Sequence, residues 1–323
     1  MEASRNLFLS RRRMCLCCIG GAAGALAGGW LTPREVFAEA RGLVSLIKDS
    51  AAVSPIITHK LRNNISVLEG SGGTVAVLSG PDGKVLIDAG IAVSQPQIMK
   101  ALNDLGGEPI THLINTHWHF DHTSGNTWLN AAGAKIIAQE NTRKYLSQVQ
   151  RVDDWDYNFL ALPSGGIPTE VFAETHSLQL NGATIALKHY GRAHTDSDIS
   201  VTFMEANVVH LADTFWNGIY PFIDYSTGGS IDGMIAASDA NLAATTGDTI
   251  IIAGHGKAIG TKAELKDFRD MLVVIREKVA ALKRAGHSRD EAVAAKPTAA
   301  FDAKFGTFVI DPGFFTRLVY EGV

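Results

Sequence analysis

Cysteine is nearly absent from this sequence of 323 residues, because its three cysteines, Cys15, Cys17 and Cys18, all lie within the first twenty positions. If the N-terminal segment is removed, the remaining chain contains no thiol. Disulfides then cannot hold the fold together, and thiolates cannot bind a metal. A metal site in the rest of the chain would have to use histidine and carboxylate ligands.

An excess of positive charge is also missing. The 29 basic and 33 acidic residues give a net charge of -4. Removal of residues 1–38 takes away five basic and two acidic residues, which leaves a net charge of -7. This balance argues against nucleic acid as a partner, because phosphates attract a basic surface. With 46% hydrophobic and 19% charged residues, the composition is typical of a soluble globular protein with a sizeable core. The expected partner is a small-molecule substrate.

The N-terminus has the pattern of an export signal. Ser10–Met14 contains three arginines in a twin-arginine pattern, Met14–Thr32 is uncharged, and Val36–Ala38 offers a small-residue cleavage site. We predict a twin-arginine signal peptide over 1–38, a mature domain over 39–323, export by the twin-arginine machinery and a periplasmic location. An uncleaved anchor is the alternative, but a stretch so rich in glycine and alanine makes a poor one, so no stable membrane anchor is expected.

Strand and helix patterns occur twice in the same order along the chain. Strands are predicted at 65–69, 74–78, 85–88, 111–115 and 135–138, then at 178–180, 184–187, 199–204, 208–211 and 249–252. Helices are predicted at 94–105, 123–132 and 141–149, then at 231–242, 262–285 and in a short segment after Ser288. A further segment, 39–58, is expected to be partly helical near 44–47. This order predicts a layered α/β arrangement.

Two segments lack a regular pattern. Residues 151–176 contain several aromatic residues, two prolines and Gly165-Gly166, which favours either a lid over a binding site or packing over a helix end. The segment 301–323 contains five phenylalanines, at positions 301, 305, 308, 314 and 315, and could pack against the core or form a dimer face. The oligomeric state stays open.

The chemistry of the chain is concentrated in the run His117-Trp118-His119-Phe120-Asp121-His122. Three imidazoles and a carboxylate follow directly after an apolar strand, and histidine is the commonest metal ligand in proteins. Side chains alternate along a strand, so His117 and His119 would share one face, while Asp121 and His122 lie where the chain turns. This layout suggests two neighbouring metal positions.

Further ligand-type residues lie where later strands end. They are His194, Asp213 and His255, and open α/β architectures place their sites at such strand ends. With the first run they make a set of five histidines and two aspartates.

This set resembles the ligand order of the metallo-β-lactamase superfamily, over about residues 60 to 285. The resemblance implies a four-layer αββα sandwich of two mixed β-sheets with two zinc ions between them. It implies that His117, His119 and His194 bind the first ion, that Asp121, His122 and His255 bind the second, and that Asp213 bridges both. Nitrogen and carboxylate ligands suit zinc, and iron or manganese would also be tolerated.

The expected reaction is hydrolysis. Two close cations lower the pKa of a shared water, so that a metal-bound hydroxide forms at neutral pH, and Asp121 is the candidate to orient it and to move its proton. An aspartate at position 213 makes the chain resemble the thioesterase, lactonase and phosphodiesterase branches of the superfamily. The absence of cysteine from the mature chain argues against the first β-lactamase class. We therefore expect an ester, lactone, thioester or β-lactam as substrate. The alternatives are a mononuclear iron enzyme resembling sulfur dioxygenases and a catalytically inactive periplasmic metal-binding protein.

Four residues beside the ligands are candidate substrate contacts. Trp118 and Phe120 could form an aromatic wall for an apolar substrate, and Asn217 or Tyr220 could donate a hydrogen bond to an oxyanion. The sequence does not rank the substrates, because specificity depends on the geometry of loops.

Overall fold

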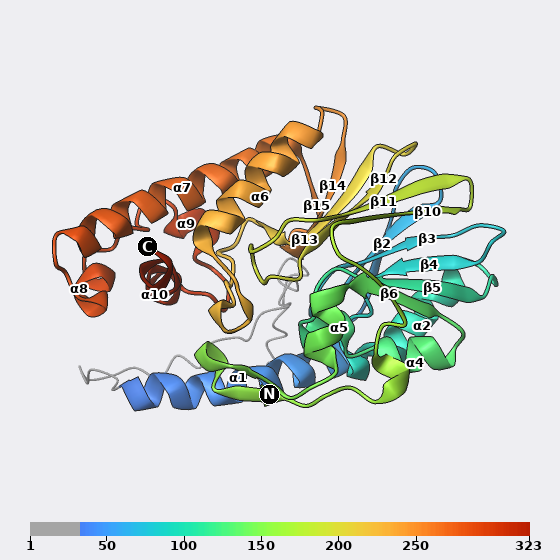
Figure 1. The fold of residues 1–323 in the computed structure, drawn as a ribbon, viewed down its shortest axis with the longest axis horizontal. Helices are drawn as coiled ribbons and strands as arrows, with labels where there is room; N and C mark the ends of the chain where they lie inside the picture. The colour runs from blue at the N-terminus through green and yellow to red at the C-terminus, as the bar shows by residue number, and fades with distance from the viewer. Residues whose placement is uncertain (1–32) are drawn as a thin grey trace, which may run out of the picture.

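The computed structural model describes residues 33–323, with side chains from residue 42 onward (Figure 1). Its strands are β1 (Ile57–Lys60), β2 (Ile65–Glu69), β3 (Val75–Leu78), β4 (Lys84–Ile87), β5 (Ile110–Asn115), β6 (Lys135–Gln139), β7 (Gln150–Val152), β8 (Tyr157–Phe159), β9 (Glu170–Phe172), β10 (Thr175–Leu180), β11 (Ala183–His189), β12 (Ile199–Phe203), β13 (Val208–Asn217), β14 (Ile250–Gly256) and β15 (Ile259–Gly260).

The α-helices are α1 (Pro33–Val53), α2 (Gln95–Asp104), α3 (Phe120–Thr123), α4 (Asn126–Ala131), α5 (Glu140–Leu146), α6 (Ile231–Ala244), α7 (Lys262–Arg284), α8 (Arg289–Ala294), α9 (Asp302–Phe305) and α10 (Pro312–Gly322). Short 3-10 turns are η1 (Ala92–Ser94), η2 (Asp153–Trp155), η3 (Ser164–Gly166) and η4 (Tyr225–Thr227).

Two sheets form the centre of the molecule. The first has the order β1-β2-β3-β4-β5-β6-β9 and the second the order β10-β11-β12-β13-β14-β15. The inner faces meet in a core to which β4 contributes Val85 and Ile87, and β11 and β12 contribute Leu187 and Val201, all buried. Strand residues that are apolar at every second position provide such a face.

Helices cover both outer faces, so the predicted αββα sandwich is confirmed. Helix α2 packs Ile98 and Leu102 on the outer side of the first sheet, and α6 and α7 cover the second sheet (Figure 1). Helix α7 begins at the capping box of Thr261 and Glu264 and buries Leu265 and Phe268 on one face. The predicted meanders and most of the predicted helices are present within a few residues of the expected bounds.

The parallel pairs within each sheet determine where the site lies. Strand β4 is parallel to β5 and β5 to β6, and β13 is parallel to β14. Because the carboxyl ends of parallel strands meet at one edge of a sheet, the segments that follow β4 and β5 come together at an edge of the first sheet, and β13 and β14 end together in the second.

Helix α1 is longer than the expected turn near 44–47. Val44 and Ala51, two turns of helix apart, are both completely buried, and α1 contacts η1 and η2. None of the helices in the described residues is long and apolar enough to cross a membrane. The predicted signal peptide lies outside the described residues except for 33–38, so its cleavage and the export route stay predictions.

The C-terminal segment packs against the rest of the domain. Phe305 and Phe315 are buried in the core that α7 shares with the second sheet, and Phe308 and Phe314 lie partly buried against it. Packing against the core, one of the two alternatives for this segment, is therefore what the structure shows.

Candidate metal centre

All seven predicted ligands come together between the two sheets, at the edge where the parallel strands end. Their ligand atoms form two groups, within each of which the atoms lie within 4.8 Å of one another: His117, His119, His194 and Asp213, and Asp121, His122 and His255. Asp213 joins the groups, because its carboxylate lies 3.3 Å from His194 Nε2 and 3.1 Å from His122 Nε2. The grouping agrees with the division that the resemblance implies.

The first run of ligands is held by Asp88, the residue directly after β4. Asp88, with φ of 65°, accepts hydrogen bonds from the Thr116 backbone N–H and hydroxyl, at 2.7 Å each, and from His122 Nδ1 at 2.8 Å. His119, with φ of -58° and ψ of 148°, is the N-cap of the single turn α3, which carries Asp121 and His122. One buried carboxylate thus fixes both ends of the run.

A bulge in β13 aims Asp213 at the cluster. The pairing of β13 with β14 shifts register on both sides of Ala212, and Ala212 adopts a left-handed φ of 45°. A bulge of this kind redirects the next side chain away from the regular alternation of a strand. Asp213 therefore points between the sheets with 2% of its side chain exposed.

Hydrogen bonds to the outer ring nitrogens orient four of the histidines. Asp224 accepts from His119 Nε2 at 2.9 Å, the Phe222 carbonyl accepts from His194 Nδ1 at 2.7 Å, and Asp88 accepts from His122 as described. His117 Nδ1 lies 3.1 Å from the Thr116 hydroxyl. Such bonds set the tautomer of a metal-binding histidine and leave the other nitrogen free to bind.

The ring nitrogens that face into the cluster are either without a hydrogen-bond partner or directed at one another. His117 Nε2 is buried without a hydrogen bond. His122 Nε2 faces His255 Nε2 at 3.3 Å, and His194 Nε2 faces His119 Nδ1 at 2.8 Å. Buried polar groups are nearly always satisfied, so these converging lone pairs fit bound cations. The residues therefore fit a metal site of histidine and carboxylate ligands.

In the absence of metal, the protein environment shifts the pKa values of the ligand side chains in opposite directions. Burial lowers the pKa of His194 to about 4 and that of His117 well below its usual value. Burial also opposes the charge on His255, but the carboxylates of Asp213 and Asp121 outweigh it and raise the pKa of His255 to about 9. Asp121 is ionised, because His122 and His255 overcome its burial and lower its pKa to about 2.

Solvent reaches the second group of ligands more than the first. Asp121 and His255 have 12% and 10% of their side chains exposed, whereas Asp213 has 2%. A reacting molecule therefore approaches the group that contains Asp121.

A glycine loop between β2 and β3 packs directly on the second group. The Gly73 N–H donates to the Asp121 carbonyl at 3.3 Å, and a β-carbon at position 73 would overlap the His122 ring. The backbone of Gly73 is not in the left-handed region, so what the position requires is space rather than conformational freedom.

The substitution Gly73→Ala is therefore expected to displace His122 and to weaken binding at the second group by about 10–100-fold, the range found when a metal ligand loses its orientation. Zinc content per chain and zinc affinity, measured by competition with a chelator, test this. The matched control is Gly107→Ala, since a β-carbon there meets nothing within 4 Å. Unchanged zinc binding in the Gly73→Ala variant would contradict the expectation that this contact keeps His122 in place for the metal.

The four candidate substrate contacts divide into two pairs. Trp118 and Phe120 line a cavity beside the run, discussed below. The polar groups of the other pair have partners elsewhere: the Tyr220 hydroxyl donates to Asp302 at 2.9 Å and the Asn217 amide donates to the Lys257 carbonyl at 3.2 Å. Tyr220 is completely buried against Phe315. We correct the expectation on this ground: neither group is free to donate to an oxyanion.

Sequence reasoning missed the two carboxylates that orient ligands. Asp88 had a signal, since it is an acidic residue at the carboxyl end of a strand whose neighbour carries the ligand run. Asp224 had none, because it lies in an irregular loop 105 positions from His119 and approaches it only in the folded chain.

Comparisons with known proteins agree with the fold. The model of the metallo-β-lactamase superfamily matches residues 68–275. The hydroxyacylglutathione hydrolase of Erythrobacter litoralis (strain HTCC2594) is 38% identical over 81 residues, which cover 25% of this chain and 27% of that protein. The uncharacterized protein YobT of Bacillus subtilis (strain 168) is 27% identical over 194 residues, 55% of this chain and 81% of that protein.

Solved structures show the same architecture at low identity. DIM-1 metallo-β-lactamase superposes with a TM-score of 0.54 and 19% identity, covering 68% of this chain and 97% of that one. The sec-alkylsulfatase Pisa1 from Pseudomonas sp. superposes with a TM-score of 0.59 and 18% identity, covering 84% of this chain and 51% of that one. These likenesses concern the fold alone.

Proposed function

This chain belongs to the metallo-β-lactamase superfamily, and from that premise we propose that it is an exported hydrolase that uses two zinc ions to cleave an ester, lactone, thioester or β-lactam. The observation that carries the proposal is the complete set of seven ligands in one buried cluster, divided into two groups. A structural zinc site is usually closed by four ligands and often by cysteines. A set that divides over two positions and opens to solvent beside Asp121 supports a catalytic role.

When bound, two zinc ions would ionise a shared water and polarise the carbonyl oxygen of the substrate. The chain's own part is to hold the nucleophile in place and to move its proton. Asp121 is suited to this, because its carboxylate is ionised, lies at the exposed side of the cluster and contacts His255 Nε2 at 3.3 Å. The buried Asp213 has no access to solvent and is suited to holding the groups together.

The substrate class rests on several weaker supports. One relative is a hydroxyacylglutathione hydrolase, which favours a hydrolytic reaction, although the matching segment covers only about a quarter of that enzyme. The net charge of -4 for the whole chain speaks against a nucleic acid substrate. Carbonyl substrates of moderate size therefore remain the proposed class.

A panel of chromogenic substrates tests the proposal, combined with metal analysis of protein purified from its own host. We expect about two zinc ions per chain and turnover of at least one ester, lactone, thioester or β-lactam. Phosphodiester and alkyl sulfate substrates complete the panel and are expected to be inert. Turnover of these alone, one iron per chain with oxidation of a thiol compound, or silence on the whole panel would each overturn the proposed hydrolase.

Export is the part of the proposal that rests on the N-terminal sequence alone. The protein is expected in the periplasmic fraction, with a mature N-terminus at Glu39. N-terminal sequencing of the fractionated protein tests this, and an intact N-terminus on cytoplasmic protein would contradict it.

A further inference from the structure

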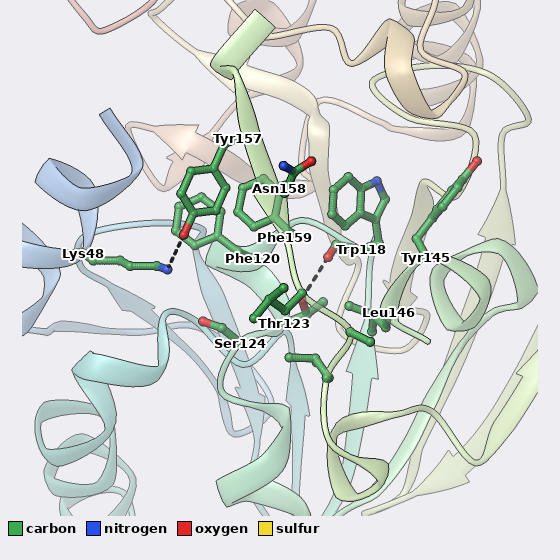
Figure 2. A pocket seen from close by; sticks show the side chains of 13 residues that line it. Lys48, Trp118, Phe120, Thr123, Ser124, Tyr145, Leu146, Tyr157, Asn158 and Phe159 are labelled. Carbon is green, nitrogen blue, oxygen red and sulfur yellow. Dashed lines mark hydrogen bonds between the residues drawn. The ribbon is translucent and has the colours of Figure 1, made fainter. Parts of the chain in front are cut away.

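A cavity of about 260 Å³ lies beside the ligand run, between α1, the segment 118–124 and the segment 157–162. Figure 2 shows the side chains that line it, with Lys48 entering from α1 and the aromatic rings of Trp118, Phe120 and Phe159 opposite. None of the seven ligands lines the cavity. His117 and His119 face the metal cluster, whereas Trp118 and Phe120, which alternate with them, face the cavity.

The walls of the cavity are aromatic. Phe120 stacks on Phe159 with ring centroids 5.3 Å apart and planes at 19°, and Tyr157 lies 4.6 Å from Phe159. Trp118 is 5.7 Å from Phe159 and 5.8 Å from Tyr145. An engineered cavity of about 150 Å³ holds benzene, so this cavity has room for one ring with a short chain or for a short acyl chain.

One positive charge stands at the mouth. Lys48 is the one charged side chain among the lining residues, and its Nζ donates to the Tyr157 hydroxyl at 3.5 Å (Figure 2). The ammonium also lies 5.7 Å from the Phe120 ring centroid and 5.6 Å from that of Tyr157. None of the ion pairs among the described residues involves it, so it has no carboxylate partner in the described part of the chain.

The rim of the cavity carries an apolar side chain that is exposed to water. Leu160 lines the cavity with 78% of its surface exposed. A large apolar side chain at the mouth of an aromatic cavity gains little in the free protein, but a bound apolar group would cover it.

We propose that this cavity is a binding site for an organic anion whose apolar ring or acyl chain lies against Trp118, Phe120 and Phe159 and whose oxyanion head binds the Lys48 ammonium. The shared chemistry is a singly charged oxyanion on an apolar group, and carboxylates and sulfates both provide it. The site is separate from the metal centre, and binding there does not depend on the reaction that the metals catalyse.

Calorimetric titration of the purified full chain tests the proposal with four probes of one shape: phenylbutyrate, phenylbutyl sulfate, phenylbutanol and phenylbutylamine. We expect at least one of the two anions to bind about tenfold more tightly than the alcohol, because a hydrogen bond to a charged group exceeds a neutral one. The amine is expected to bind most weakly. The comparison of carboxylate with sulfate identifies the preferred head group.

Substitutions then locate the site. Lys48→Met is expected to remove the preference for anions while leaving the alcohol unaffected, and Lys48→Arg is expected to retain the preference. Ala161→Phe, which fills the lining at an exposed position, is expected to weaken all four probes at least tenfold. Lys60→Met on the exposed strand β1 is the matched control for charge.

Three outcomes would overturn the proposal: no binding of any probe at millimolar concentration, an anion preference that survives Lys48→Met, or unchanged binding in Ala161→Phe. Because Lys48 and Ala161 are not core residues, circular dichroism of each variant is expected to match that of the parent protein. The readout is binding, so it stays informative even if the chain proves to be inactive on every substrate.

Discussion

Replacement of Asp121 by asparagine is expected to lower turnover by a factor of about 10²–10⁴, the usual contribution of a positioned acid–base group. The amide keeps the size of the carboxylate and an oxygen that can face a metal, but it cannot accept a proton. Asp121 Oδ2 lies 3.3 Å from His255 Nε2 at the exposed side of the cluster, where a reacting group would arrive. Asp121→Ala, which also removes the ligand oxygen, is expected to abolish turnover. The measurement is kcat on the best substrate of the panel.

Metal content decides what such a loss means. If zinc per chain stays near that of the parent protein while kcat falls, the carboxylate acts in proton transfer. A fall in kcat that only follows a fall in zinc would assign Asp121 to holding metal instead. Asp239→Asn, at an exposed aspartate paired with Arg269 at 2.7 Å, is the matched control and is expected to leave kcat unchanged. Full activity of Asp121→Ala would contradict the proposed mechanism.

Local sequence patterns predicted most of the fold, because the apolar residues of each helix or strand recur at the spacing typical of that element. The β2–β4 meander follows from β-branched residues at strand spacing and a Pro81-Asp82-Gly83 turn. Helix α7 follows from its capping box and its apolar face. Helix α1 exceeded its prediction, since what fixes it is burial of Val44 and Ala51 against distant segments, which no local pattern records.

The same division applies to the site. The positions of the ligands could be predicted, because each follows a strand and carries a metal-binding side chain. How they are aimed could not be predicted. The bulge at Ala212 and the hydrogen bond from His119 to Asp224 depend on strand pairing and on loop packing. Tyr220 shows the reverse error, since an aromatic residue near the ligands in sequence packs into the core on Phe315.

The charge balance of the cluster explains why one carboxylate matters most. In the protein without metal, burial opposes the charge on His122, but Asp213, Asp121 and Asp88 raise its pKa well above the usual value, and the pKa of His255 is about 9. Both rings are therefore protonated at neutral pH. Metal binding must release these protons, so metal affinity is expected to fall as pH falls through neutrality. Asp213 exerts the strongest attraction on the charge of both rings, and its carboxylate also lies close to ligands of both groups.

Removal of the Asp213 carboxylate is expected to empty both metal positions together. Its oxygens lie 3.1 Å from His122, 3.2 Å from His255 and 3.3 Å from His194, so this one residue contacts ligands of both groups. Asp213→Ala is expected to retain well below one zinc per chain, against about two in the parent protein. Turnover is expected to fall at least as far as in Asp121→Asn, because Asp213→Ala loses the metal at both positions, whereas Asp121→Asn loses one acid–base group.

The isosteric variant separates loss of charge from loss of packing. Asp213→Asn keeps the volume of a side chain that is 2% exposed, so its fold is expected to survive even if the alanine variant unfolds. Zinc content of both variants, measured after dialysis against a weak chelator, and near-ultraviolet circular dichroism are the readouts. An amide is a poorer ligand than a carboxylate and cannot balance two cations, so we expect Asp213→Asn to lose zinc with a native spectrum. Retention of two zinc ions in a folded Asp213→Asn would show that the two groups hold their metals independently and that Asp213 does not bridge them.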